Sequence, residues 1–270
     1  MSADEVKSGM KRRGGWTVAW AQITGVHHSV CEDRLAHRVL KRENAGGLCL
    51  AVADGVGGGA RGDVAAEALA RHCVDVPAAL IGKSDTLAQW MRMAEGQVQL
   101  RLREVTFSPG AATLVAAWLD ADGKGHLMHV GDCRAYRYGN GLLEVLTEDQ
   151  TYTHIGEKPP EGVPTEAPAR MVGTGCMGEP NLRPLSLSSG ETLLLCSDGL
   201  HRDLETSKIA ETLLSTSKSL QTVCIALVNA ARQAGSEDDI TVQLARRSIG
   251  VGIAAQGWRW LLDWSRRLMT

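Results

Sequence analysis

The segment LLLCSDGLHRD (Leu193–Asp203) changes character at its centre, where an apolar run ends in Ser-Asp-Gly. The segment LCLAVADGVGGG (Leu48–Gly59) has the same form, with Asp54 in the position that Asp198 takes later. A short, continuous apolar run bounded by turn residues is typical of a strand buried on both faces. Each segment is therefore predicted to bring an aspartate to the end of a buried strand.

The remaining elements follow from apolar periodicity and from turn residues. In chain order we predict strands over 16–24, 33–40 and 47–53, helices over 62–80 and 86–105, strands over 111–120, 125–131, 133–139, 142–147 and 191–197, helices over 204–215 and 219–235, and a strand over 239–247. The strands over 111–147 are predicted to form one antiparallel meander, because short turns join them. This order does not fit parallel β–α–β alternation and favours antiparallel sheets flanked by paired helices.

Three segments differ from the rest of a predicted catalytic domain over residues 16–248. Residues 1–15 are polar and are predicted to be a flexible N-terminal tail. Residues 148–184 are rich in Pro and Gly, and a segment this long without periodicity is typical of a functional flap. Residues 249–270 place Trp and Leu at helical spacing among arginines. This amphipathic C-terminal tail is predicted to contact a membrane surface or a partner, or to pack back on the domain.

Composition excludes several classes of protein. The net charge of −2 gives no basic face of the kind that nucleic acid requires. The seven cysteines form no CxxC pair, which argues against a zinc site or a disulfide framework and favours a reducing compartment. No apolar run reaches the roughly 20 residues of a membrane span, and the N-terminus lacks the apolar core of a signal peptide. We therefore expect a cytoplasmic protein without a transmembrane segment.

Acidic side chains recur where predicted strands end. They are Glu32, Asp33, Asp54, Asp132, Asp198, Asp238 and Asp239. Carboxylates that converge must be neutralised, and Mg²⁺ and Mn²⁺ prefer such oxygen ligands. A glycine directly after an aspartate also lets its backbone carbonyl approach a metal ion. A single Asp-Gly pair is more often a plain turn, so the prediction of a two-metal site rests on the whole set.

Six short blocks occur in an order that is highly specific as a set. They are VCEDR (30–34), VADGVGG (52–58), GAATLV (110–115), HVGDCRAYRY (129–138), LLLCSDGL (193–200) and GSEDDITV (235–242). In these blocks the chain resembles the protein phosphatase 2C family in its compact bacterial form, from about Ala21 to Arg246. The resemblance implies an α+β fold, a four-layer αββα sandwich in which two antiparallel β-sheets are flanked by pairs of antiparallel helices.

The resemblance also implies a ligand set for two Mn²⁺ or Mg²⁺ ions. It implies that Asp54 bridges the two ions. Asp198 and Asp238 are expected to complete the coordination of one ion, directly or through water. Glu32 and the carbonyl of Gly55 are expected to coordinate the other ion.

Further roles are implied for the remaining acids. Asp33 is expected to hold a metal-bound water, and Asp132, with Asp198, to bind a third ion of the kind seen in bacterial members. Asp54, Asp198 and Asp238 are the expected catalytic residues.

The implied activity is that of a metal-dependent protein serine/threonine phosphatase. A metal-bridging water would attack phosphorus in line, without a covalent phosphoenzyme. The expected partners are phosphorylated protein substrates and a cognate bacterial Ser/Thr kinase that the phosphatase opposes, and the protein is expected to be a monomer.

Three residues depart from the usual family pattern. His28 occupies the position of an arginine that binds substrate phosphate, and it lacks the bidentate fork of Arg. Cys31 and Asp239 each replace an asparagine, and Asp239 adds negative charge. His28 and Asp239 leave open an alternative, a degenerate pseudophosphatase that binds phosphoproteins or regulates a kinase. A metal-dependent phosphodiesterase or nuclease is a third hypothesis, against which the absence of a basic face argues.

Overall fold

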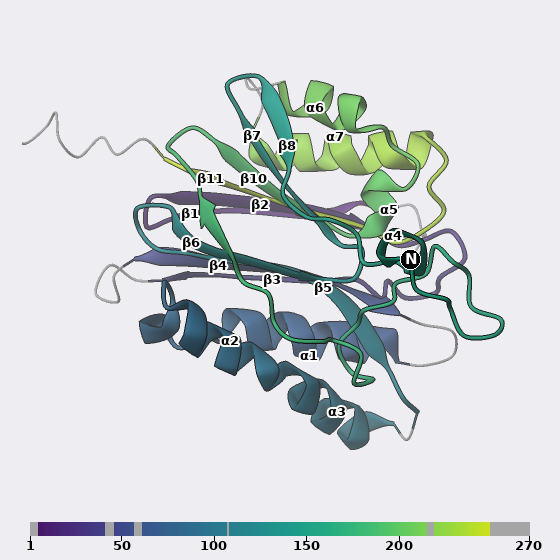
Figure 1. Ribbon diagram of the computed structural model, residues 1–270. Coiled ribbons are helices and arrows are strands. Elements are labelled where there is room, and N and C mark those ends of the chain that lie inside the picture. Colours follow the sequence, from purple (N-terminus) through teal and green to yellow (C-terminus); the bar gives the residue numbers. More distant parts are fainter. Residues whose placement is uncertain (1–4, 41–45, 57–60, 107, 215–218, 249–270) are drawn as a thin grey trace, which may run out of the picture.

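Two antiparallel β-sheets form the centre of the protein (Figure 1). The computed structural model describes residues 5–40, 46–56, 61–106, 108–214 and 219–248. The six-stranded sheet has the order β1 (Lys7–Arg13), β2 (Trp16–Ile23), β11 (Ile240–Arg247), β10 (Thr192–Cys196), β7 (Arg134–Gly139) and β8 (Leu142–Val145). The five-stranded sheet has the order β3 (Arg34–Leu40), β4 (Gly47–Val56), β5 (Ala111–Leu119), β6 (Lys124–Val130) and β9 (Arg183–Ser186). The predicted C-terminal amphipathic tail over 249–270 lies outside the described residues.

Helices cover the outer face of each sheet (Figure 1). The helices α1 (Gly62–Val74), α2 (Ser84–Arg92) and α3 (Ala94–Val105), with a short 3₁₀ turn over Ala78–Leu80, lie on the five-stranded sheet. The helices α6 (Thr206–Leu214) and α7 (Leu220–Gln233) lie on the six-stranded sheet. Two single-turn helices, α4 (Tyr152–Ile155) and α5 (Asp198–His201), complete the described elements.

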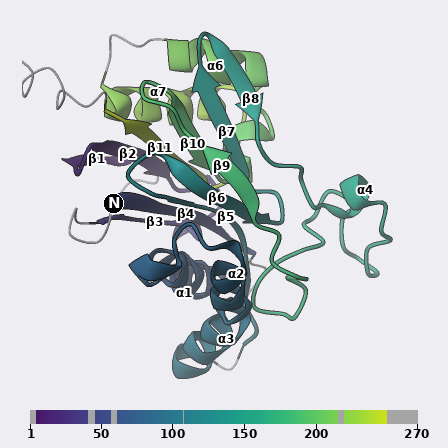
Figure 2. The same ribbon diagram turned by 60° about the vertical axis from the view of Figure 1, so that its left-hand side comes forward.

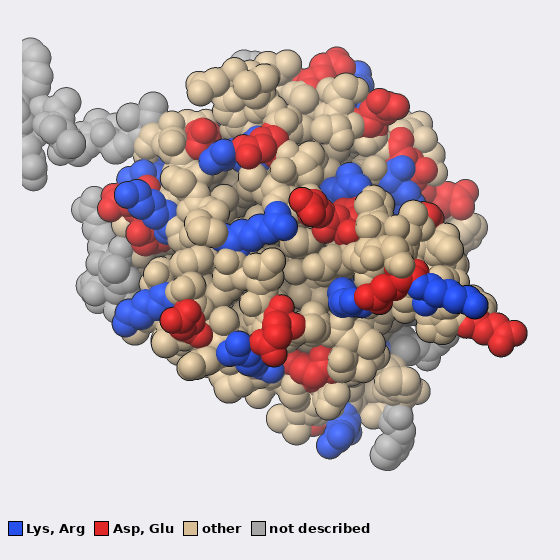
Figure 3. All heavy atoms as spheres, in the orientation of Figure 1, with Lys and Arg blue, Asp and Glu red and all other residues tan. Residues whose placement is uncertain are grey.

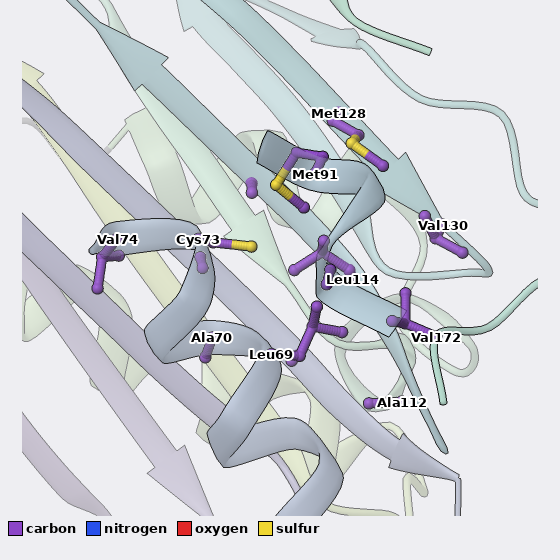
Figure 4. Packing of buried hydrophobic residues seen from close by; sticks show 14 of the residues in the cluster. Leu69, Ala70, Cys73, Val74, Met91, Ala112, Leu114, Met128, Val130 and Val172 are labelled. Carbon is purple, nitrogen blue, oxygen red and sulfur yellow. The ribbon is translucent and has the colours of Figure 1, made fainter. Parts of the chain in front are cut away.

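Three hydrophobic clusters separate these layers. One lies between the two sheets and contains Trp16, Leu50 and Leu195. A second packs α1–α3 on the five-stranded sheet (Figure 4), and a third packs α6 and α7 on the six-stranded sheet. A sheet between two such clusters buries both of its faces, which explains the continuous apolar runs of β5 and β10, whose residues are all buried. The predicted α+β fold with two antiparallel sheets and flanking helices is confirmed.

Strand pairing brings distant segments to the same end of both sheets. In the five-stranded sheet Asp54 pairs with Thr113. In the six-stranded sheet Cys196, two residues before Asp198, pairs with both Arg134 and Val242. Because the pairing is antiparallel, the ends of β4, β6 and β10 meet the beginnings of β5, β7 and β11 at this end. The acidic residues at these strand ends are thereby gathered.

The prediction of a flexible N-terminal tail is wrong for residues 7–13. These residues form β1, which pairs with β2 from Lys7 opposite Gln22 to Arg13 opposite Trp16. The two strands are joined by Gly14 and Gly15, which have φ values of 59° and 84°. Two consecutive glycines with positive φ form the tight turn that a β-hairpin favours. The Gly-Gly pair was therefore a hairpin signal, but the prediction relied on the polar composition of residues 1–15.

The predicted meander over 111–147 is also wrong in one respect. β5 and β6 belong to the five-stranded sheet, whereas β7 and β8 belong to the six-stranded sheet. The chain crosses between the sheets at Gly131, whose φ of 90° suits glycine, so Asp132 lies at a corner between two sheets. The prediction of one helix over 86–105 is wrong as well, because α2 ends at Arg92 and α3 begins at Ala94, with Met93 between them.

The segment predicted as a flap leaves the body of the protein and returns to it (Figure 2). Gln150 near its start donates to the carbonyl of Gly131 at 2.9 Å. Val172 near its end exchanges two backbone hydrogen bonds of 2.9 Å with Ala112 of β5. Backbone bonds therefore hold both ends of the excursion beside the gathered strand ends. No helix within the described residues is long and apolar enough to cross a membrane.

Replacement of Leu69 by alanine tests the cluster between α1 and the five-stranded sheet (Figure 4). Leu69 is fully buried, so Leu69→Ala leaves a cavity and is expected to lower the free energy of unfolding by about 2–5 kcal/mol. Leu100→Ala on α3 is the matched control, because Leu100 is 56% exposed, and its expected effect is within about 0.5 kcal/mol. Urea denaturation measures both, and equal losses would contradict the described packing.

Candidate active site

A cavity of about 470 Å³ opens at the end of the sheets where the acidic residues gather. Its lining comes from both sheets and from the loops between them, namely His28, Glu32, Asp54, Gly55, Val56, Thr113, Asp132, Pro168, Asp198, Arg202, Asp238 and Asp239. Every residue that the sequence analysis assigned to metal or phosphate binding is in this set except Asp33. Their roles as ligands stay predictions, but the shared cavity on which those predictions depend is present.

Three aspartates form the inner part of the cavity. One carboxylate oxygen from each of Asp54, Asp132 and Asp198 lies within 4.8 Å of the others. Burial, together with neighbouring carboxylates, raises the pKa of Asp54 well above its usual range and that of Asp132 to about 7. The Oδ1 atoms of Asp132 and Asp198 are buried and have no hydrogen-bond partner within the described residues. Such a cluster requires protons or a cation, since buried acceptors without partners are costly.

Glu32 and Gly55 bring two further oxygens together beside α1. A Cβ atom added to Gly62 would lie 2.9 Å from Glu32 Oε2 and 2.9 Å from the carbonyl oxygen of Gly55. A Cβ atom added to Gly55 would lie only 2.4 Å from the backbone of Gly62. The two glycines are therefore required by the close approach of β4 to the start of α1. This approach keeps the Gly55 carbonyl and the Glu32 carboxylate on the same side of the cavity.

Asp33 lies outside the cavity lining and is fully buried. Its Oδ2 accepts a hydrogen bond of 2.7 Å from the Ser197 hydroxyl, whereas its Oδ1 has no partner within the described residues. Burial, followed by the charge of Asp239, raises the pKa of Asp33 to about 8. The expected role of Asp33 in holding a metal-bound water is left untested by this geometry.

Asp239 organises the loop that carries His28 and Glu32. Its Oδ1 accepts from the backbone N–H of Gly25 at 2.6 Å, and its Oδ2 accepts from that of Glu32 at 2.7 Å. Oδ2 also lies 3.0 Å from His28 Nδ1, and this hydrogen bond raises the pKa of His28. The Asp239 side chain is only 3% exposed. Three donors therefore compensate the negative charge of Asp239, and these contacts hold the loop from Gly25 to Glu32 in place.

Arg202 is a cavity residue that the sequence analysis missed. It follows α5, and its guanidinium donates to Asp198 Oδ2 and, at 3.1 Å, to Asp238 Oδ2. A usable signal was present, because Arg202 is four residues after Asp198 and the i, i+4 spacing places two side chains on one face of a helical turn. Its neighbour His201 is held in place by a 2.9 Å hydrogen bond to the carbonyl of Asp132. Burial lowers the pKa of His201 to about 4, so its imidazole is neutral.

The geometry matches a known family. Residues 26–244 match the family model described as "Protein phosphatase 2C", and this range contains every residue that lines the cavity. The chain belongs to the protein phosphatase 2C family. The resemblance of the six sequence blocks is thereby confirmed, and the two sheets with their converging acids are the form that the family fold takes here.

One similar protein and two solved structures support this membership. The serine/threonine phosphatase stp of Listeria welshimeri is 30% identical over 214 residues, which cover 73% of this chain and 84% of that protein. The crystal structure of the Mycobacterium tuberculosis serine/threonine phosphatase PstP/Ppp is 26% identical, covers 87% of this chain and 99% of its own, and has a TM-score of 0.70. The catalytic domain of PstP in complex with two manganese ions has 26% identity, the same coverage and a TM-score of 0.68.

The residues of this protein phosphatase 2C chain fit hard divalent ions. The cavity offers carboxylate and carbonyl oxygens and no thiol, which is the donor set that Mn²⁺ and Mg²⁺ prefer. The unpartnered Oδ1 atoms of Asp132 and Asp198 point to the same conclusion, because a cation would satisfy them. The face in Figure 3 has Lys and Arg interspersed with Asp and Glu and shows no continuous basic band.

Addition of Mn²⁺ to metal-free protein tests this fit. A ligand that binds only the folded state stabilises it by about 2.7 kcal/mol at one hundred times its dissociation constant, so the melting temperature should rise with Mn²⁺ concentration. Asp54→Asn should remove most of this rise, because Asp54 contributes to the inner carboxylate cluster. Asp85→Asn, at an exposed position of α2, is the control and should retain the rise. A full rise in Asp54→Asn would contradict the assignment.

Proposed function

We propose that this chain is a metal-dependent protein phosphatase that hydrolyses phosphoserine and phosphothreonine on proteins. The observation that carries the proposal is the convergence of Asp54, Asp132 and Asp198, from three distant segments, in one cavity of a protein phosphatase 2C fold. Relatives named serine/threonine phosphatase, of which stp is covered over 84% of its length, support the same reaction.

The acidic residues of the cavity would hold the metal ions. Asp54, Asp198 and Asp238 would serve one position, and Glu32 with the Gly55 carbonyl would join Asp54 at the other. Asp132 would serve a third ion. Bound divalent ions would lower the pKa of a coordinated water and neutralise charge on the phosphoryl group, which are the two requirements of hydrolysis at phosphorus.

The protein's own groups would prepare the site around these ions. Asp239 fixes the loop from Gly25 to Glu32 through two backbone N–H groups, so that His28 and Glu32 face the cavity. Protonated His28 can donate to a phosphate oxygen at the mouth of the cavity. Pro168, from the segment predicted as a flap, lines the same cavity, so this segment would contact bound substrate.

A cysteine nucleophile finds no support among the described residues. Six of the seven cysteines are buried, and burial raises the pKa of Cys31, Cys133 and Cys196, which lie within two residues of Glu32, Asp132 and Asp198. A catalytic thiol requires the opposite shift. Cys176 is exposed but does not line the cavity. Direct attack by water is therefore the mechanism that the residues favour.

The substrates would be phosphorylated proteins, and the natural counterpart would be a bacterial Ser/Thr kinase whose phosphorylation this enzyme reverses. We further propose that the protein acts as a monomer in the cytoplasm. The seven free cysteines suit such a reducing compartment.

Three phosphate esters test the proposed reaction. With Mn²⁺ present, p-nitrophenyl phosphate and a phosphothreonine peptide should be hydrolysed, and bis-(p-nitrophenyl) phosphate should react far more slowly. Asp54→Asn should lower kcat/KM for the monoester by at least about a hundredfold, because even outer-shell changes at metal sites cost 10–100-fold. Asp85→Asn should leave it unchanged.

Other outcomes would overturn the proposal. Binding of Mn²⁺ without turnover of either monoester would indicate a phosphoprotein-binding pseudophosphatase. A preference for the diester would indicate a phosphodiesterase.

A further inference from the structure

Arg202 occupies an unusual position at the mouth of the acidic cavity. Its side chain is 53% exposed, and its guanidinium contacts two carboxylates that line the cavity, the buried Asp198 and the partly exposed Asp238. The charged end of Arg202 therefore lies where the acidic cavity meets solvent.

The backbone that carries Arg202 is firmly held. The Arg202 N–H donates to the carbonyl of Asp198 at 2.9 Å, which closes the turn of α5. The Ser236 hydroxyl donates to the carbonyl of Gly199 at 2.8 Å. A Cβ atom added to Gly199 would lie 2.1 Å from the carbonyl oxygen of Asp239, so α5 lies directly against the segment before β11. Hydrogen bonds and close packing thus fix the backbone at Arg202, whereas its side chain is 53% exposed.

The cavity is lined by many carboxylates and by few side chains that could bind a negatively charged substrate. Six carboxylates line it, and among the described lining residues only His28 and Arg202 can carry positive charge. His28 commits Nδ1 to Asp239, so it has one nitrogen left for a ligand. A phosphomonoester brings about two further negative charges. Arg202 is the lining residue that offers a planar fork of donors, which suits phosphate oxygens.

We propose that Arg202 binds the phosphate of the substrate, and so supplies the guanidinium that the histidine at position 28 cannot. The assignment rests on the proposed phosphatase function. In the structure the guanidinium is held by Asp198 and Asp238, two of the expected metal ligands. A bound divalent ion would compete with the guanidinium for these oxygens, and the end of Arg202 would then be available to a phosphate at the cavity mouth.

Kinetics and direct binding together test the role of Arg202. With saturating Mn²⁺, Arg202→Gln should raise KM for p-nitrophenyl phosphate by about ten- to a hundredfold, the value of a charge-assisted hydrogen bond, and leave kcat within a few-fold. This pattern is expected because the contact is made in both the ground state and the transition state. Arg202→Lys should be intermediate, since it keeps the charge and loses the fork.

Titration of inorganic phosphate into Mn²⁺-loaded protein gives a measurement that does not depend on turnover. The dissociation constant for phosphate should rise in Arg202→Gln by the same factor as KM. The affinity for Mn²⁺, measured in the same variant, should be equal to or higher than that of the natural chain, because a competitor for Asp198 and Asp238 has been removed. Arg137→Gln is the matched control, since Arg137 also pairs with a carboxylate, Glu144, but lies outside the cavity.

Each result decides one of the two proposals. Unchanged phosphate affinity and unchanged KM in Arg202→Gln would overturn the role of Arg202 while leaving the phosphatase function intact. A weaker affinity for Mn²⁺ that accounts for the whole loss would also overturn it. If the natural chain hydrolyses no monoester, the function fails, but phosphate binding that depends on Arg202 would still support the phosphate site. Absence of phosphate binding to the natural chain would overturn that site.

Discussion

The close approach of buried carboxylates from two sheets is the constraint on which the rest of this structure depends. Burial disfavours the charged form of Asp54, and the neighbouring carboxylates repel it, so both raise its pKa. The cluster persists because Asp54 and Asp198 are carried by β4 and by the end of β10, both packed in the hydrophobic layers. The free energy that these layers supply keeps the acids together, and a divalent cation is the partner that would satisfy the remaining oxygens.

Hydrogen bonds around the cluster hold the neighbouring loops and acidic side chains in place. Asp239 holds the loop before β3 through backbone N–H groups, and Ser197 meets one oxygen of Asp33. The contact between Gly55 and Gly62 brings the start of α1 against β4, so a helix from one outer layer helps to shape the cavity. Residues of both sheets, of an outer helix and of the segment over 148–184 therefore meet at one place, and the site forms only when the whole domain has folded.

Much of this arrangement could be predicted from the sequence, and the failures have physical causes. The apolar runs before Asp54 and Asp198 carry a strong strand signal, so both aspartates were placed at strand ends correctly. The crossing between sheets at Gly131 was missed because a short turn has the same sequence pattern whether it joins two strands of one sheet or strands of two different sheets. The contact of Arg202 with Asp198 has a local i, i+4 signal, whereas its contact with Asp238, 36 residues further along the chain, arises only through tertiary structure and has no local pattern.

The hydrogen bond between His28 and Asp239 places two of the departures from the family pattern in direct contact. His28→Ala would leave the buried Asp239 carboxylate with two donors in place of three. Asp239→Ala would remove both oxygens that accept from the backbone N–H groups of Gly25 and Glu32. The effect of a substitution at one of these positions therefore depends on the residue at the other.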